Sequence, residues 1–383
     1  MSDRRAISAS AIVAQIAQRS AEGVSVISFE DLIIQGQLDF SGTRVNFPLT
    51  FVRCDFEREL KFCGAAVDAL LLSGCHLNGF DGEALEVGSD LQLCDATEVA
   101  GVVLLDRARI GGNLSCSGAS LRGSGGSALS VDEAVVEGHV VMGIGFRASG
   151  TVSIRGAWIG GMLYCAHGIF DNPGGIAIAA DDLEVAGHVM LNHGFKAGGT
   201  VILQRAKFHR LLYCAHGTFE NPGGEAIRAD GLKVDGRVAF SEWFCAKGAV
   251  TMRGAALGEE LFCVGGIFQN PGGVALDAEG VEVRGSVRMH ARFLVQGAVR
   301  FTGAKIGGAL HCGNGRFEHR GGVALAANGA TIGGDVILGS GFRAEGTVNL
   351  DGAKIAGSLD AEYAVHDGLT TAGAAIGKRS DSD

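Results

Sequence analysis

Apolar residues occupy every second position in short runs along most of the chain, and glycine-rich turns separate the runs. An i, i+2, i+4 spacing is typical of β-strands with one buried face and cannot form the apolar stripe of a helix. Phenylalanine recurs nine times at steps of 24 and 25 residues, from Phe146 to Phe342. Another position alternates leucine with valine, at Leu114, Val140, Leu163, Val189, Leu212, Val238, Leu261, Val287, Leu310, Val336 and Leu359.

The repeating unit is 49 residues long and consists of two similar halves. Five copies begin at Ala108, Ala157, Ala206, Ala255 and Ala304, and a sixth begins at Ala353 and fades near Thr371. Each half of 24 or 25 residues is typical of one coil of a parallel β-solenoid, in which like residues stack about 4.8 Å apart. Earlier coils are shorter, as the 22-residue step from Leu38 to Leu60 indicates.

The pattern therefore predicts an all-β protein with a single parallel β-helix (β-solenoid) over residues 24–371, on the order of 14 coils. Its most regular part spans residues 108–352. Ser8 to Gln18 reads as an amphipathic helix with Ile12, Val13 and Ile16 on one face, so residues 1–23 are expected to cap the first coil. With Arg4 and Arg5, the same helix could instead contact a membrane surface. Residues 372–383 are predicted to be a disordered tail.

These stacked columns, which cover nearly the whole chain, resemble the right-handed parallel β-helix superfamily. They are similar, less closely, to the bactofilins, which are bacterial β-helices that form filaments and scaffolds. The resemblance implies right-handed winding of the coils. It also implies a structural role based on self-assembly.

Composition and charge narrow the function classes. The chain has 383 residues with 62 glycines, 47% apolar and 19% charged residues, and a net charge of −10. No block of Lys or Arg is longer than Arg4-Arg5, so we expect no nucleic-acid partner. No run of 18 apolar residues and no signal-peptide core occurs, and ten cysteines accompany no secretion signal. A cytoplasmic location follows as the expectation.

Neither the cysteines nor the acidic residues form a catalytic or metal-binding pattern. One cysteine per 49 residues, at Cys116, Cys165, Cys214, Cys263 and Cys312, places the thiols two coils apart, too far for a disulfide or a shared metal. We interpret them as buried filler. An acidic ladder, Asp132, Asp181, Asp230 and Glu279, alternates with Arg155, Gln204 and Arg253 and predicts ion pairs between coils. No catalytic residue, metal or cofactor is expected.

The candidate binding surface is an apolar strip on the outer side of one strand column. Side chains next to inward-pointing residues point outward, which gives a strip of Met162, Tyr164, Met190, Leu211, Tyr213 and Phe262, with His167 and His216 nearby. The repeat breaks at residues 207–211 and 257–260, a second candidate. Three Asn-Pro-Gly-Gly sequences, at residues 172–175, 221–224 and 270–273, predict tight corners.

The sequence thus favours a non-catalytic structural or scaffold protein that acts through protein–protein contacts or self-assembly, with a protein partner or a second copy of itself. An alternative is a carbohydrate-binding or carbohydrate-active β-helix, because the outer strip is aromatic and the surface carries acidic ladders. A third hypothesis is an acidic mimic of nucleic acid.

Overall fold

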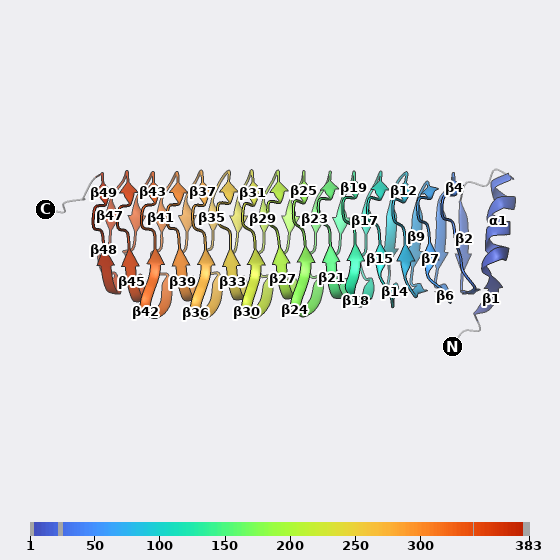
Figure 1. The fold of residues 1–383 in the computed structure, drawn as a ribbon, viewed down its shortest axis with the longest axis horizontal. Helices are drawn as coiled ribbons and strands as arrows, with labels where there is room; N and C mark the ends of the chain where they lie inside the picture. Colours follow the sequence, from blue (N-terminus) through green and yellow to red (C-terminus); the bar gives the residue numbers. More distant parts are fainter. Residues whose placement is uncertain (1–3, 22–25, 340, 378–383) are drawn as a thin grey trace. The chain divides into compact units, whose positions relative to one another are not determined.

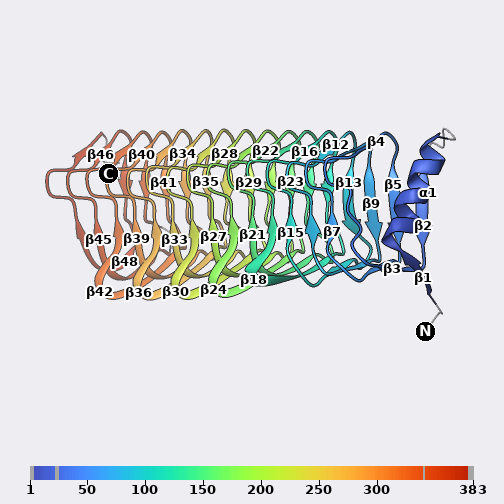
Figure 2. The same ribbon diagram turned by 45° about the vertical axis from the view of Figure 1, so that its right-hand side comes forward.

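The computed structural model describes residues 4–21, 26–339 and 341–377. The chain divides into two compact units, Met1–Gly187 and His188–Asp383. Each unit is a stack of coils in which successive strands pair in parallel (Figures 1 and 2). The predicted all-β parallel solenoid is therefore confirmed, with about 16 coils of about 23 residues instead of about 14.

Three sheets run along the coils of the first unit. Sheet A contains β1 (Arg5–Ser8), β3 (Leu32–Gln35), β6 (Asp55–Phe56), β7 (Leu60–Lys61), β10 (His76–Leu77), β11 (Phe80–Asp81), β14 (Glu98–Val99), β15 (Val103–Leu104), β18 (Ser120–Ser130), β21 (Arg147–Ser153) and β24 (Ile169–Ala179). Sheet B contains β2 (Ile27–Glu30), β5 (Leu49–Val52), β9 (Leu70–Ser73), β13 (Leu91–Cys94), β17 (Leu114–Ser115), β20 (Val140–Val141) and β23 (Leu163–Tyr164). Sheet C contains β4 (Arg44–Val45), β8 (Ala66–Val67), β12 (Glu86–Val87), β16 (Arg109–Ile110), β19 (Val135–Val136), β22 (Trp158–Ile159) and β25 (Glu184–Val185).

The second unit repeats this arrangement, and the chain passes from sheet B to sheet A to sheet C in every coil. Its sheet A strands are β27 (Lys196–Ile202), β30 (Thr218–Arg228), β33 (Cys245–Thr251), β36 (Ile267–Asp277), β39 (Leu294–Arg300), β42 (Arg316–Ala326), β45 (Arg343–Asn349) and β48 (Val365–Thr370). Sheet B contains β26 (Val189–Met190), β29 (Leu212–Tyr213), β32 (Val238–Ala239), β35 (Leu261–Phe262), β38 (Val287–Arg288), β41 (Leu310–His311), β44 (Val336–Ile337) and β47 (Leu359–Asp360). Sheet C contains β28 (Lys207–Phe208), β31 (Lys233–Val234), β34 (Ala256–Leu257), β37 (Glu282–Val283), β40 (Lys305–Ile306), β43 (Thr331–Ile332), β46 (Lys354–Ile355) and β49 (Ala375–Ile376).

The predicted residue columns form the core of each unit. In the second unit, the register pairs Leu212 with Val238 and Leu261 with Val287, and all four side chains are fully buried. The phenylalanine column packs ring on ring, with centroids 5.0 Å apart for Phe195–Phe219 and 5.2 Å apart for Phe317–Phe342. Identical or similar side chains therefore pack against each other from coil to coil, as the spacing predicts.

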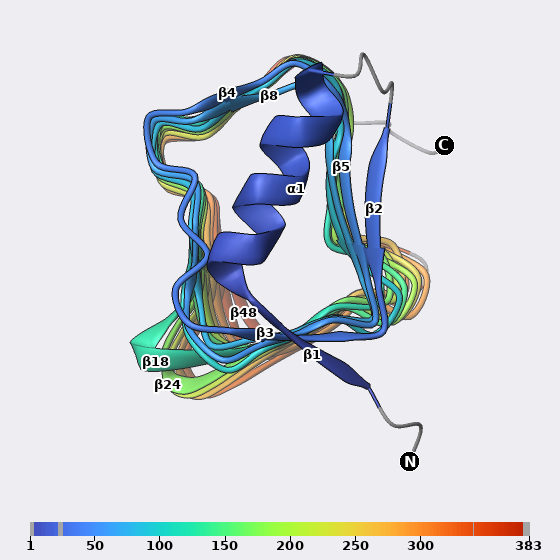
Figure 3. The ribbon, with the colours of Figure 1, turned by 90° about the vertical axis from the view of Figure 1, so that its right-hand side faces the viewer.

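The N-terminal edge of the first unit is covered by α1 (Ala9–Ala21), which lies across the first coil in Figure 3. Ile12 is fully buried and Ile16 is 6% exposed, as expected for a capping face. The expectation for Val13 was wrong, because this side chain is 41% exposed. Ala9, Ile12 and Ile16 share one side of the helix, and Val13 lies about 100° from Ile12 around the axis. Strand β1, which no pattern predicted, pairs with β3 just before the helix begins.

Glycine allows close backbone contact at the corner between sheets C and B. A Cβ atom at Gly161 would lie 2.6 Å from the carbonyl oxygen of Gly138 and 2.3 Å from Nδ1 of His139, in the coil before it. A Cβ atom at Gly138 would lie 2.6 Å from the oxygen of Gly112. Any larger residue would force the coils apart, so the glycine column fixes their spacing here.

The Asn-Pro-Gly-Gly sequences do form turns, with a φ of 73° at Gly174. Their expected position at a corner between sheets was wrong. The turn interrupts the long strand β24, where the register with β21 shifts between Ser149 and Val152, so the extra residues protrude from sheet A. The Nδ2 of Asn172 donates hydrogen bonds to the carbonyl of Ile176, at 2.9 Å, and to Thr151 Oγ1, at 3.1 Å.

The last described coil is formed by β47, β48 and β49. Strand β49 pairs with β46, so the solenoid continues to Gly377 and includes part of the segment 372–383 that was expected to be disordered. Residues 378–383 lie outside the described part of the chain.

Candidate functional site

The cysteine column lies inside the solenoid. Cys116, Cys165, Cys214, Cys263 and Cys312 are all buried and free, as expected for filler. Burial raises the pKa of the Cys116 thiol to about 12 and raises the pKa of the other four thiols as well. The neutral thiol is a poor nucleophile and a poor metal ligand, so this column offers no redox or metal chemistry.

The acidic ladder forms contacts with arginine side chains and backbone N–H groups of neighbouring coils. Arg155 Nε lies 3.3 Å from Asp181, and the backbone N–H of Arg155 donates to Asp132 at 2.7 Å. Arg253 departs from the prediction, because only its backbone N–H contacts Asp230 and its guanidinium binds Asp277 at 2.7 Å. Sequence reasoning missed Asp277, a carboxylate with 1% exposure. Buried carboxylates need such partners, so these acids are committed to holding the coils together.

The first-unit part of the predicted strip consists of Met162, Tyr164 and His167. Met162 and Tyr164 are half-buried beside the fully packed Leu163 and Cys165. The Tyr164 ring lies against the backbone of Gly143 in the coil before it, since a Cβ there would approach the ring to 2.8 Å. His167 is exposed at a turn, with a φ of 64°.

The second-unit part is also half-buried, at Met190, Leu211, Tyr213 and Phe262. Met190 pairs with Tyr213, and Ala239 pairs with Phe262, along sheet B. The guanidinium of Arg237 lies 5.1 Å from the Phe262 ring centroid, which partly covers this end of the strip. The strip is thus a narrow row with its own polar cover, and not a broad exposed apolar patch.

Glu242 joins two of the predicted residues. Its carboxylate accepts a hydrogen bond from Tyr213 Oη at 3.4 Å and lies 3.5 Å from His216 Nε2. Burial and the nearby Glu242 carboxylate raise the pKa of Tyr213. His216 also stacks on His193, with centroids 5.7 Å apart. The sequence pattern placed Tyr213 and His216 on the surface but gave no sign that Glu242 links them.

The two breaks in the repeat are explained by packing and ion pairs. Phe208 and Leu257 are buried in the position that isoleucine takes in neighbouring repeats. Around them, His209 Nδ1 lies 3.0 Å from Asp235, and Glu260 contacts Arg237 and Arg288 at 3.4 and 2.9 Å. At these breaks, apolar side chains still fill the core position, and the polar residues beside them contact charged residues of neighbouring coils.

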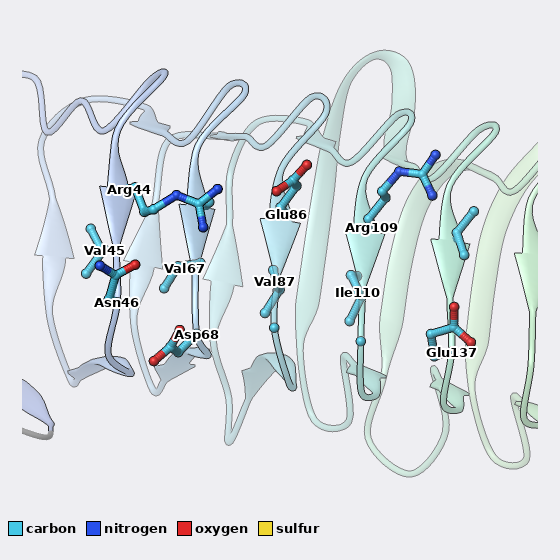
Figure 4. A pocket seen from close by; sticks show the side chains of 14 residues that line it. Arg44, Val45, Asn46, Val67, Asp68, Glu86, Val87, Arg109, Ile110 and Glu137 are labelled. Atoms are coloured by element: carbon cyan, nitrogen blue, oxygen red, sulfur yellow. The ribbon is translucent and has the colours of Figure 1, made fainter.

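A groove of about 410 Å³ runs along the outer face of sheet C in the first unit (Figure 4). Arg44, Glu86 and Arg109 project along one side, and Asp68 and Glu137 along the other. Within the described residues, neither arginine forms an ion pair. Sequence reasoning missed this groove, because its residues vary from coil to coil and only their stacking in sheet C brings them together.

The described residues contain one group with metal-ligand geometry, Cys63, Asp81 and Glu83, whose ligand atoms lie within 4.8 Å of one another. Glu83 forms an ion pair with Arg107, and burial together with Asp81 and Glu83 raises the pKa of the Cys63 thiol. These contacts favour the protonated thiol and occupy one carboxylate, so the group does not fit a bound cation well.

The edge of the last coil leaves core positions open. Leu359, Leu369 and Ile376 are half-buried, although they continue columns in which Val336, Val348 and Ile355 are buried in the coil before. Within the described part of the chain, no strand pairs with the outer edges of β47, β48 and β49. Such edges carry free N–H and C=O groups that can pair with another strand.

Comparison of the chain with protein-family models, with curated proteins and with solved structures finds no match. No helix in the described residues has the length and hydropathy needed to cross a membrane.

Proposed function

We propose that this protein is a non-catalytic structural protein that self-associates through its C-terminal coil. The observation that carries the proposal is the open edge formed by β47, β48 and β49, with Leu359, Leu369 and Ile376 half-buried. Unpaired parallel strands above an apolar core favour pairing with another strand edge.

The partner that this edge fits best is a second copy of the same edge. The N-terminal edge of the first unit offers no equivalent, because α1 covers it with Ile12 and Ile16. Two copies that meet at this edge would give a closed pair around a two-fold axis.

Mass measured across a range of concentrations tests this proposal. We expect a transition from the chain mass to twice that mass, with no larger species. The variant Leu369→Lys places a charge in the open core column and should abolish the pair. Thr370→Lys is the matched control, because it adds the same charge at an exposed position one residue away. A protein that stays monomeric at every concentration contradicts the proposal, as does equal loss in both variants.

Two other functions receive less support from the surface. A carbohydrate-active enzyme built on the acidic ladder would need carboxylates free to act, and Asp132, Asp181 and Asp277 are bound to arginine side chains or backbone. An acidic mimic of nucleic acid would need a continuous negative surface, and Arg44 and Arg109 interrupt it in the sheet C groove.

A further inference from the structure

Trp243 and Arg292 occupy a position that the repeat gives to glycine in the other equivalent turns, at Gly145, Gly194 and Gly341. In this unit, Gly194 and Gly341 have φ angles of 83° and 84°, and Trp243 and Arg292 have φ angles of 68° and 71°. A bulky residue in this left-handed region costs on the order of 1–3 kcal/mol. The indole is 65% exposed, so core packing does not offset this strain. The two residues that depart from glycine at this position, Trp243 and Arg292, line the same hollow.

The indole borders a hollow of about 380 Å³ at the corner between sheets B and A of the second unit. Val264, Ile267 and Ala291 supply apolar wall, and His216, Glu242 and Arg292 supply polar groups. The hollow therefore combines one flat aromatic face with hydrogen-bonding groups of both charges.

The polar groups are held in place before any ligand arrives. The Tyr213 hydroxyl donates to Glu242 at 3.4 Å, and His216 lies 3.5 Å from the same carboxylate. Stacking on His193 fixes the His216 ring. Glu242 also has a positive φ, of 51°, so the turn directs the side chains of Glu242 and Trp243 outward together. Fixed groups lose little entropy on binding.

The chemistry of the hollow favours a neutral ligand with many hydroxyl groups. A carboxylate and a guanidinium in one hollow balance each other's charge, and together they can accept from and donate to hydroxyls. The face of an indole suits the C–H face of a sugar ring. A broad protein interface fits less well, because the other exposed large apolar residues described in this unit, Val323, Tyr363 and Val365, do not line the hollow.

We propose that this hollow binds a pyranose ring of a neutral glycan, stacked on Trp243 with its hydroxyls directed to Glu242 and Arg292. The site is separate from the C-terminal coil and does not depend on self-association. The hollow would attach this structural protein to a glycan, and the buried core would contribute only to stability.

Tryptophan fluorescence gives a local test, because the chain contains only two tryptophans. In a Trp158→Phe protein, Trp243 is the sole emitter. We expect saturable changes in its emission on titration with at least one of three neutral probes, cellohexaose, chitohexaose and mannohexaose. No response to any of the three overturns the proposal, as would a response of equal size in Trp243→Phe protein that retains Trp158.

Calorimetric titration of two further variants separates binding from folding. Trp243→Gly should weaken binding of the responding probe at least tenfold, and its thermal midpoint should stay equal or rise because glycine accepts the positive φ. Glu242→Gln should also weaken binding, with an unchanged midpoint. Full affinity in Trp243→Gly overturns the proposal. It is also overturned if the hollow binds a protein through Trp243 and none of the sugar probes.

Discussion

At the scale of single residues, the buried thiols make the stability of the fold sensitive to high pH. Burial raises the pKa of Cys165 above its ordinary value of 9.0, so the folded protein keeps this proton when the unfolded chain has lost it. The stabilising effect is complete below pH 9 and is lost as the pH rises toward the folded pKa. Above pH 9, the loss is up to about 1.4 kcal/mol per pH unit for each thiol.

Cys165→Ala should therefore reduce the alkaline loss of stability. We expect the variant to be less stable than the parent at pH 8 because a buried side chain is shortened, and the difference to shrink at pH 10.5. Urea denaturation of both proteins at the two pH values measures it. A difference that is the same at both pH values contradicts the assigned cause.

Glycines with two different physical roles can be told apart by the same substitution. Gly161→Ala would place a Cβ 2.6 Å from the Gly138 oxygen, and should cost about 3 kcal/mol. Gly174→Ala meets no atom within 4 Å but keeps a φ of 73°, and should cost about 1 kcal/mol. Thermal midpoints of the two variants give the order. A larger loss in Gly174→Ala would show that contact between coils does not fix the corner.

At the scale of elements, α1 is the one helix in the described residues and covers an edge that would otherwise be open. Ile12→Ala removes a fully buried side chain and should cost about 3 kcal/mol. Val13→Ala is the matched control, because this side chain is 41% exposed, and should change stability by less than about 0.5 kcal/mol. Thermal denaturation measures both. Equal losses would mean that the helix does not bury its Ile12 face against the coils.

The sequence predicts the interior elements well because each column is repeated many times. Leu212, Val238 and Leu261 share one environment, so the period alone places them inside. Strand β1 occurs once and forms because β3 offers an edge with which it can pair, so no periodicity predicts it. Val13 was misplaced because it lies about 100° from Ile12 around the helix, and only the side that carries Ala9, Ile12 and Ile16 is buried.

Candidate sites are harder to predict, because they consist of exceptions to the repeat. The link between Tyr213, His216 and Glu242 crosses coils, and only the stacking register brings these side chains together. Trp243 and Arg292 did leave a signal, since aligning the turns sets both residues against Gly194 and Gly341. Departures from a column of glycines are thus a pattern with which to search a repeat protein for sites.

At the scale of the whole molecule, a net charge of −10 opposes self-association, and the last coil shares in this charge. Glu362 and Asp367 are exposed beside the open edge, and the described residues of this coil include no lysine or arginine. Two copies that meet at this edge bring like charges together. Screening by salt weakens such repulsion but leaves the pairing of strands and apolar side chains in place.

The proposed pair should therefore form more tightly as salt increases. Between about 20 mM and 500 mM sodium chloride, where the screening length falls from roughly 20 Å to roughly 4 Å, we expect the dissociation constant to fall roughly tenfold. The variant Glu362→Gln with Asp367→Asn should pair tightly at low salt and respond less to added salt, because its repulsion has been removed. Sedimentation equilibrium of both proteins at the two salt concentrations measures this. An association that weakens with salt would mean that opposite charges hold the copies together, and the contact would then have to lie away from this acidic edge.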